Sequence, residues 1–186
     1  VIGGNCSLYN ETNGEGILPT PTIGGVGLMR DVSKMATIAF KRQDDVVIVI
    51  GETGGHLGQS IYLREIEGRE DGAAPKVDPG LEKKHGNFVR GLIEAGRVDT
   101  CHDVSDGGLL VAVAEMAMGG GIGASIGTAG LPDTIAFWFG EDQARYIIAA
   151  PFAQADKIIA EARAAFIPVA ALGKTGGDRL TLDDKD

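Results

Sequence analysis

The segment that most constrains the fold of this chain is a run of five consecutive β-branched residues, Val46 to Ile50. Valine and isoleucine favour β-strands, and a strand that is apolar at every position is covered on both faces of its sheet. A glycine-rich stretch follows directly, at residues 51–58. The sequence therefore predicts a buried central strand whose end opens into a tight loop.

Apolar residues recur at helical spacing in three later segments, 81–95, 107–118 and 153–166. Asp78 and Pro79 precede the first of these, at positions that suit an N-cap and a first-turn proline. Short apolar runs predict further strands at residues 36–40, 98–102, 145–149, 169–172 and 180–182. Strands that alternate with helices indicate an α/β fold, in which helices pack on a mixed sheet.

The first 35 residues differ in character from the rest. They are rich in Gly, Pro, Asn and Thr, and the stretch Pro19–Gly25 is typical of an extended connector, because proline fixes φ and restricts the residue before it. We therefore expect a connector over residues 1–35 and a compact domain over residues 36–186. The chain starts at Val1 rather than at a methionine, so we expect it to be a fragment of a larger protein.

Charge and composition disfavour several classes of partner. The chain has 17 Lys and Arg against 26 Asp and Glu, a net charge of −9, which disfavours nonspecific binding to nucleic acid. It has no run of 18 apolar residues and no signal segment, so we expect a cytoplasmic protein without a membrane partner. One disulfide between Cys6 and Cys101 is possible, but two buried, reduced thiols are the favoured interpretation. Glycine makes up 29 of 186 residues, and its clusters predict tight turns.

Three glycine-containing corners could bind an anion. In Gly3–Thr12 two glycines precede small polar residues: a glycine backbone can approach a phosphate, and the Asn5 amide oxygen can ligate Mg²⁺. Gly51–Ser60 follows the apolar strand, but it lacks the Lys-Ser/Thr pair of a P-loop. Cys101–Leu109 ends a strand and opens a helix that Ser105 or Asp106 could cap. An ordinary structural turn is the alternative at each corner.

Other motifs favour structural interpretations. His102, Asp103 and Ser105 are too close in sequence to face one another as a triad. The string Gly123–Gly127 matches G-x-S-x-G but has no helix after its serine, so it is interpreted as a turn. The cysteines and histidines show no zinc-like spacing. The acidic pair in Phe139–Ile147 is interpreted as a solvated pair in a polar turn, with a binding loop as the alternative.

Together these segments resemble one enzyme family, the phosphoribosylformylglycinamidine synthases, in the bacterial synthetase subunit (subunit II). The resemblance runs in order along nearly the whole chain, and its motifs are Gly3–Thr12, Pro19–Pro21, Ile23–Gly27, His102–Leu109 and Phe139–Gln143. The family usually has valine where Cys6 stands. The resemblance implies a C-terminal fragment of that subunit.

In such a fragment, residues 1–35 would be the tail of an N-terminal-type domain and a connector. Residues 36–186 would be a C-terminal domain of the aminoimidazole-ribonucleotide-synthetase type, truncated at its end. The resemblance implies a ligase that uses ATP and Mg²⁺ to convert formylglycinamide ribonucleotide and glutamine-derived ammonia to the amidine, in de novo purine biosynthesis. It also implies two partners, a glutaminase subunit and a small accessory subunit.

Position by position, the resemblance implies that Gly4 contacts ATP, Asn5 binds Mg²⁺ and Ser7 contacts the substrate. A pseudo-repeat in the family suggests a second-copy site at Glu52, Glu141 and Gln143. No catalytic residue falls in this chain, so the fragment alone is expected to be inactive. The alternatives are a non-catalytic scaffold or subunit-docking domain, and a kinase-like member of the same superfamily such as thiamine-monophosphate kinase or selenophosphate synthetase.

Overall fold

The computed structural model describes residues 11–17, 24–128 and 135–183. The chain divides into two units, Val1–Ser33 and Lys34–Asp186. In the first unit, β1 (Glu11–Thr12) pairs antiparallel with β2 (Glu15–Gly16). Asn13 and Gly14 join these strands with φ values of 54° and 82°, the left-handed backbone that a tight hairpin turn requires. A short 3₁₀ helix, η1 (Val32–Lys34), includes the last residues of this unit and the first residue of the next.

The second unit is built on a six-stranded sheet with the order β4-β6-β3-β7-β5-β8. Adjacent strands are antiparallel except β5 and β8, which are parallel. The strands are β3 (Val46–Ile50), β4 (Thr100–Asp103), β5 (Ala124–Ile126), β6 (Tyr146–Ala150), β7 (Val169–Thr175) and β8 (Leu180–Leu182). The predicted class, a mixed sheet with helices packed on it, is confirmed.

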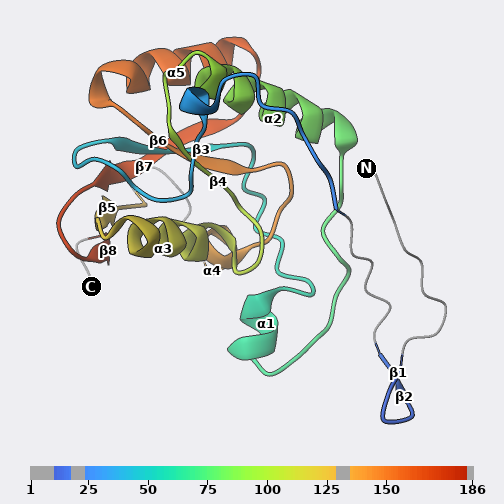
Figure 1. Ribbon diagram of the computed structural model, residues 1–186. Coiled ribbons are helices and arrows are strands. Elements are labelled where there is room, and N and C mark those ends of the chain that lie inside the picture. The colour runs from blue at the N-terminus through green and yellow to red at the C-terminus, as the bar shows by residue number, and fades with distance from the viewer. Residues whose placement is uncertain (1–10, 18–23, 129–134, 184–186) are drawn as a thin grey trace. The chain divides into compact units, whose positions relative to one another are not determined.

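Helices cover both faces of this sheet (Figure 1). The helices of the unit are α1 (Ile61–Glu65), α2 (Pro79–Glu94), α3 (Gly108–Gly120), α4 (Ile135–Phe139) and α5 (Phe152–Ala164). In β3, Val47 and Val49 belong to a core with α3 and α4, whereas Ile48 and Ile50 belong to a second core with α2 and α5. All five residues of β3 are buried. The unbroken apolar run is thus explained by a strand between two layers of helices.

Several elements differ from the sequence-based expectations. Residues 36–40 do not form a strand: only Thr37 makes a bridge, to Thr100. The expected turn at Gly123–Gly127 contains β5, which pairs with both β7 and β8. Helix α3 begins after Gly107, whose φ is 80°, and it has no side-chain cap, so the expected Ser105 or Asp106 cap is wrong. Asp78 does cap α2, accepting from the N–H groups of its first turn, as predicted.

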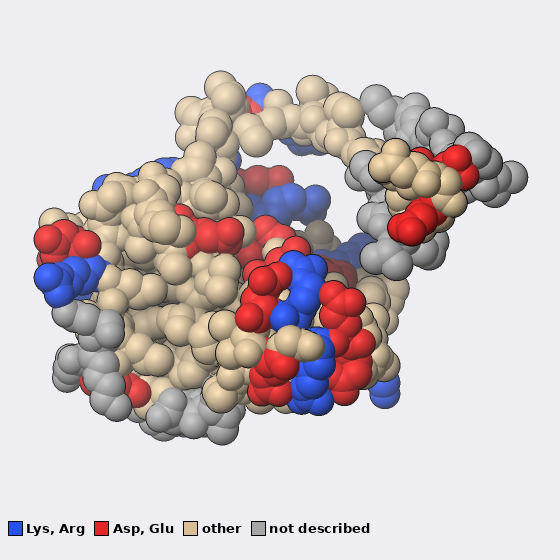
Figure 2. Space-filling model, turned by 90° about the horizontal axis from the view of Figure 1, so that it is seen from below, with Lys and Arg blue, Asp and Glu red and all other residues tan. Residues whose placement is uncertain are grey.

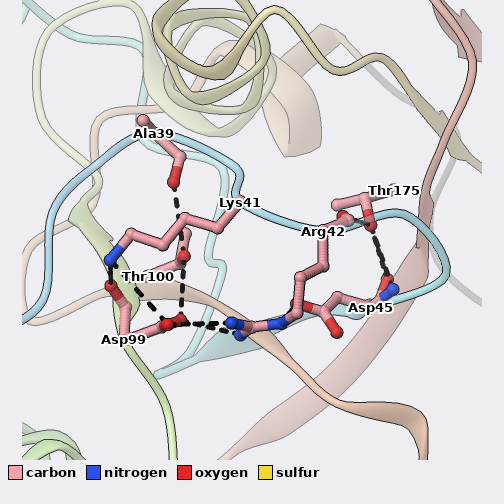
Figure 3. Close-up of polar contacts among 7 residues, drawn as sticks. All are labelled: Ala39, Lys41, Arg42, Asp45, Asp99, Thr100 and Thr175. Atoms are coloured by element: carbon pink, nitrogen blue, oxygen red, sulfur yellow. Dashed lines mark hydrogen bonds and ion pairs between the residues drawn. The ribbon is translucent and has the colours of Figure 1, made fainter.

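The segment before β3 is fixed by polar contacts rather than by strand pairing (Figure 3). The Arg42 guanidinium donates to both Asp99 oxygens, at 2.8 and 2.7 Å, and to Asp45 Oδ2 at 3.0 Å. Lys41 Nζ donates to the Asp99 carbonyl. Thr175 Oγ1 accepts from Asp45 N–H at 3.0 Å and donates to the Arg42 carbonyl at 2.8 Å. Arg42 lowers the pKa of Asp99, whereas burial raises the pKa of Asp45. These contacts fix the conformation of the segment immediately before the central strand β3.

Candidate functional site

The start of α1 and the glycine corner before α3 meet at a single carboxylate. Glu141, on the loop between α4 and β6, accepts two main-chain hydrogen bonds at Oε1. One comes from the N–H of Ile61, at the start of α1, and the other from the N–H of Gly107, just before α3; both are 2.8 Å long. Several N–H groups that donate to one anionic oxygen form the arrangement by which proteins bind anions. Here the anion is a side chain of the same domain.

The neighbouring carboxylate binds the glycine-rich loop after β3. Asp142 Oδ2 accepts from the N–H of Gly55 at 2.8 Å, and both Asp142 oxygens lie 3.3 Å from the N of His56. In return, the N–H of Glu141 donates to the His56 carbonyl at 2.8 Å. The main chain of the loop after β3 is therefore bonded both to the Asp142 carboxylate and to the Glu141 N–H.

Arg145 lies behind this loop with a fully buried side chain. Its Nε donates to the Asp142 carbonyl at 2.9 Å and its Nη2 to the Gly140 carbonyl at 2.6 Å. Nη2 also lies 4.0 Å from Asp142 Oδ2. Burial lowers the pKa of Arg145, while Asp142 and Glu141 oppose that shift. The guanidinium thus holds the acidic loop in one conformation and balances part of its charge.

The glycines at this junction bring backbone against backbone. A Cβ on Gly140 would lie 2.4 Å from the Ala136 carbonyl oxygen and 2.9 Å from the Gly55 carbonyl carbon. A Cβ on Gly108, whose φ is 76°, would lie 2.6 Å from the carbonyl carbon of Phe139. Real Cβ atoms do not approach other atoms this closely. The glycines therefore serve the packing of one loop on another.

The sequence-predicted site residues fall into two groups. Gly4, Asn5 and Ser7 lie outside the residues that the structure describes. Glu52 is exposed and has no hydrogen-bond or ion-pair partner within the described part of the chain. Glu141 is half-buried, as is Gln143, whose Nε2 donates to the Glu141 carbonyl at 3.4 Å. Glu141 and Gln143 are therefore in contact, whereas the Glu52 side chain is not in contact with either of them.

The expected solvated acid pair is wrong. Asp142 has a side-chain exposure of only 19%, and both acids bind main-chain N–H groups of distant segments. Sequence reasoning also missed Arg145 as part of this site. One signal could have found it: an arginine directly before the apolar strand β6 calls for a buried anionic or carbonyl partner.

Among the residues that the structure describes, other reactive side chains give no sign of a second chemical centre. Burial raises the pKa of the Cys101 thiol to about 12, so it is protonated and a poor nucleophile at neutral pH. His102 lies between two carboxylates, with Nδ1 3.2 Å from Asp103 Oδ1 and Nε2 2.9 Å from Glu115 Oε2. Across residues 11–17, 24–128 and 135–183, no group of three His, Cys, Asp or Glu side chains is arranged to hold a metal ion. In the same ranges, no helix is long and apolar enough to cross a membrane.

Acidic and basic side chains are intermixed on the face that carries α1 (Figure 2). Arg64 pairs with Glu65 at 2.8 Å, and Arg69 pairs with Glu67 at 3.0 Å and with Asp71 at 3.1 Å. Ion pairs of this exposed kind neutralise one another and contribute little to stability. The face therefore offers no continuous basic surface for a polyanion.

The chain was then compared with known proteins. The family model described as "AIR synthase related protein, C-terminal domain" matches residues 42–185. Phosphoribosylformylglycinamidine synthase subunit PurL of Azorhizobium caulinodans is 58% identical over 184 residues, which covers 98% of this chain and 25% of the relative. The corresponding protein of Bradyrhizobium diazoefficiens is 53% identical over 185 residues, with the same coverage. The chain thus spans about a quarter of the length of these curated relatives.

A solved structure of PurL from Thermotoga maritima complexed with FGAR has the same fold. Its TM-score is 0.68 at 18% identity, over 83% of this chain and 28% of that one. The family match includes all six strands of the sheet and the five helices of the second unit. Since the family model spans well over half of its residues, the chain belongs to the AIR synthase related proteins and carries their C-terminal domain.

Proposed function

We propose that this chain is the C-terminal part of a phosphoribosylformylglycinamidine synthase subunit of the PurL type. The observation that carries the proposal is the 58% identity over 184 residues to a protein of that name. The whole protein would be an ATP-dependent carbon–nitrogen ligase of purine biosynthesis, located in the cytoplasm. It would convert formylglycinamide ribonucleotide and ammonia to the amidine, with a glutaminase subunit and a small accessory subunit as partners.

Within this proposal, residues 1–35 are the end of an N-terminal-type domain and its connector, and residues 36–186 are the C-terminal-type domain. Gly4 would contact ATP, Asn5 would bind Mg²⁺ and Ser7 would contact the substrate. The described residues contain no cluster of metal ligands, and internal carboxylates accept the N–H groups of Gly55 and Gly107. A working site would therefore need the rest of the longer protein.

ADP formation from ATP by the full-length protein tests this proposal. We expect turnover with ATP, Mg²⁺, formylglycinamide ribonucleotide and an ammonia source, and a fall of at least about tenfold in Asn5→Ala, because a lost magnesium ligand weakens the metal site. Thiamine monophosphate, offered in place of the ribonucleotide, distinguishes the ligase from the kinase-like alternative. Turnover of thiamine monophosphate alone, or of neither compound, would contradict the ligase assignment.

A second candidate function, a scaffold that supports other domains of the enzyme, has a specific observation in its favour. Glu141 of the suggested second-copy site is engaged by main-chain N–H groups at 2.8 Å and so is committed to holding the fold. Kinetics of Gln143→Ala in the full-length enzyme distinguish the two functions. A scaffold predicts an unchanged KM for ATP and ribonucleotide with a lower Tm, whereas a ligand site predicts a KM raised about tenfold or more, since a lost polar contact to a ligand costs about 1.4 kcal/mol or more.

A further inference from the structure

We propose that the Glu141 carboxylate is a built-in anion: it occupies the position that a phosphate or small carboxylate would take between the start of α1 and the start of α3, and it thereby positions both segments. This proposal concerns the conformation of the domain and does not depend on the ligase activity. It assigns Glu141 a role as a positioning residue.

The first argument is the convergence of donors on one atom. The N–H groups of Ile61 and Gly107 come from segments far apart in sequence, and both reach Glu141 Oε1 at 2.8 Å. Gly107 immediately precedes α3, a helix of 13 residues whose N-terminal end carries a partial positive charge. Donors of two segments that point at one oxygen, beside a helix N-terminus, form the environment in which proteins hold anions.

The second argument is that the adjacent carboxylate repeats this behaviour. Asp142 accepts from the N–H groups of Gly55 and His56, in the middle of the glycine-rich loop. Two side chains of one loop therefore engage four main-chain donors: two in the glycine-rich loop, one at the start of α1 and one just before α3. An external phosphate would have to displace these carboxylates before it could reach the same donors.

The third argument is that main-chain N–H groups, rather than a salt bridge, hold the Glu141 side chain within the described part of the chain, although its charge interacts with that of Arg145. Its side-chain contacts in the described part of the chain are to main-chain N–H groups, whereas the guanidinium of Arg145 lies 4.0 Å from Asp142 Oδ2. A carboxylate in a salt bridge would hold two side chains together. Glu141 instead satisfies main-chain donors, and this is the task of a bound anion.

Hydrogen–deuterium exchange of the full-length protein, read by mass spectrometry, tests the proposal. In Glu141→Ala the peptides that contain Ile61 and Gly107 should exchange about tenfold faster, because a half-buried N–H without its acceptor opens more easily. Glu141→Gln keeps an acceptor oxygen at the same reach and loses only the charge, so we expect an increase of about threefold. Glu52→Ala is the matched control: this exposed carboxylate has no partner among the described residues, and exchange should not change.

Two added anions complete the test. Acetate should slow exchange in Glu141→Ala back towards the native rate, because it can enter the space the side chain leaves, and inorganic phosphate should leave the same peptides of the native protein unchanged. Native exchange rates in Glu141→Ala would overturn the proposal, as would protection of these peptides by phosphate in the native protein. Faster exchange that acetate does not slow would reduce Glu141 to a tether and overturn its role as an anion. If Glu141→Ala does not fold, Glu141→Gln and the native protein with phosphate decide in the same way.

Discussion

Replacing Arg145 with alanine should lower the free energy of unfolding by about 3–5 kcal/mol, the usual cost of removing one partner of a buried ionic contact. The substitution leaves the carbonyls of Gly140 and Asp142 without their donors and the Asp142 carboxylate without its neighbouring cation. Urea unfolding of the chain measures the effect. The fluorescence of Trp138, the one tryptophan of the sequence, is a suitable signal because its side chain is buried in the core beside α3.

The control for this prediction is Arg90→Ala. Arg90 is exposed, and its Nε lies 3.7 Å from Glu94 Oε1 on the same helix. An exposed pair of this kind contributes about 0.5 kcal/mol or less, so the control removes an arginine without removing a buried charge. Arg145→Lys keeps the charge but not the planar set of donors, and it should fall between the two. A loss of less than about 1 kcal/mol in Arg145→Ala would mean that the guanidinium does not hold the acidic loop.

Gly120→Ala should destabilise the chain by about 2–3 kcal/mol, although alanine is the better helix former. Gly120 is the last residue of α3, and a Cβ there would lie 2.2 Å from the carbonyl oxygen of Phe40 and 2.9 Å from its N and C atoms. These are main-chain atoms of the segment that leads into β3, and the N–H of Phe40 is bonded to the Met116 carbonyl at 3.0 Å. The segment therefore has to move away from α3 to admit a methyl group. The same urea titration measures this loss.

The neighbouring glycine provides a matched control for this substitution. A Cβ on Gly119 would meet its nearest neighbour, the Ala39 Cβ, at 3.6 Å, which is an ordinary van der Waals contact. Gly119→Ala should therefore show the intrinsic helix preference alone, a gain of about 0.5–1 kcal/mol. Equal stabilisation by both substitutions would show that the segment around Phe40 does not pack on the end of α3.

The parts of the fold that could be predicted from sequence are those whose pattern is local. The five apolar residues of β3 and the Asp78 cap of α2 need no distant partner to be recognised. By contrast, residues 36–40 have strand-like composition, but their main chain is used elsewhere: Thr37 bonds at the edge of β4, and Phe40 bonds to α3. Strand β5 has only three residues, and its conformation is set by pairing on both sides. Long-range pairing decided both cases.

Prediction of the candidate site was limited in the same way, by contacts between segments distant in sequence. Sequence motifs identified the two glycine corners, because polar residues at the ends of apolar strands are conspicuous, and the family resemblance suggested Glu141. What they could not supply is the contact between Glu141 and the N–H groups of Ile61 and Gly107, since those donors belong to the main chain and have no side-chain signature. For the same reason an acidic pair that looked solvated proved to be half-buried.

At this junction the hydrogen-bond donors belong to the main chain and the acceptor is a side chain, and this affects how the domain tolerates mutation. Every residue except proline supplies the same N–H group, so substitutions at Ile61 can preserve this donor while the side chain changes. The acceptor, however, depends on a single codon, that of Glu141. A single nucleotide change in that codon can remove the internal carboxylate and leave the two N–H donors in need of an external anion. The domain therefore lies one mutational step from acquiring a ligand requirement.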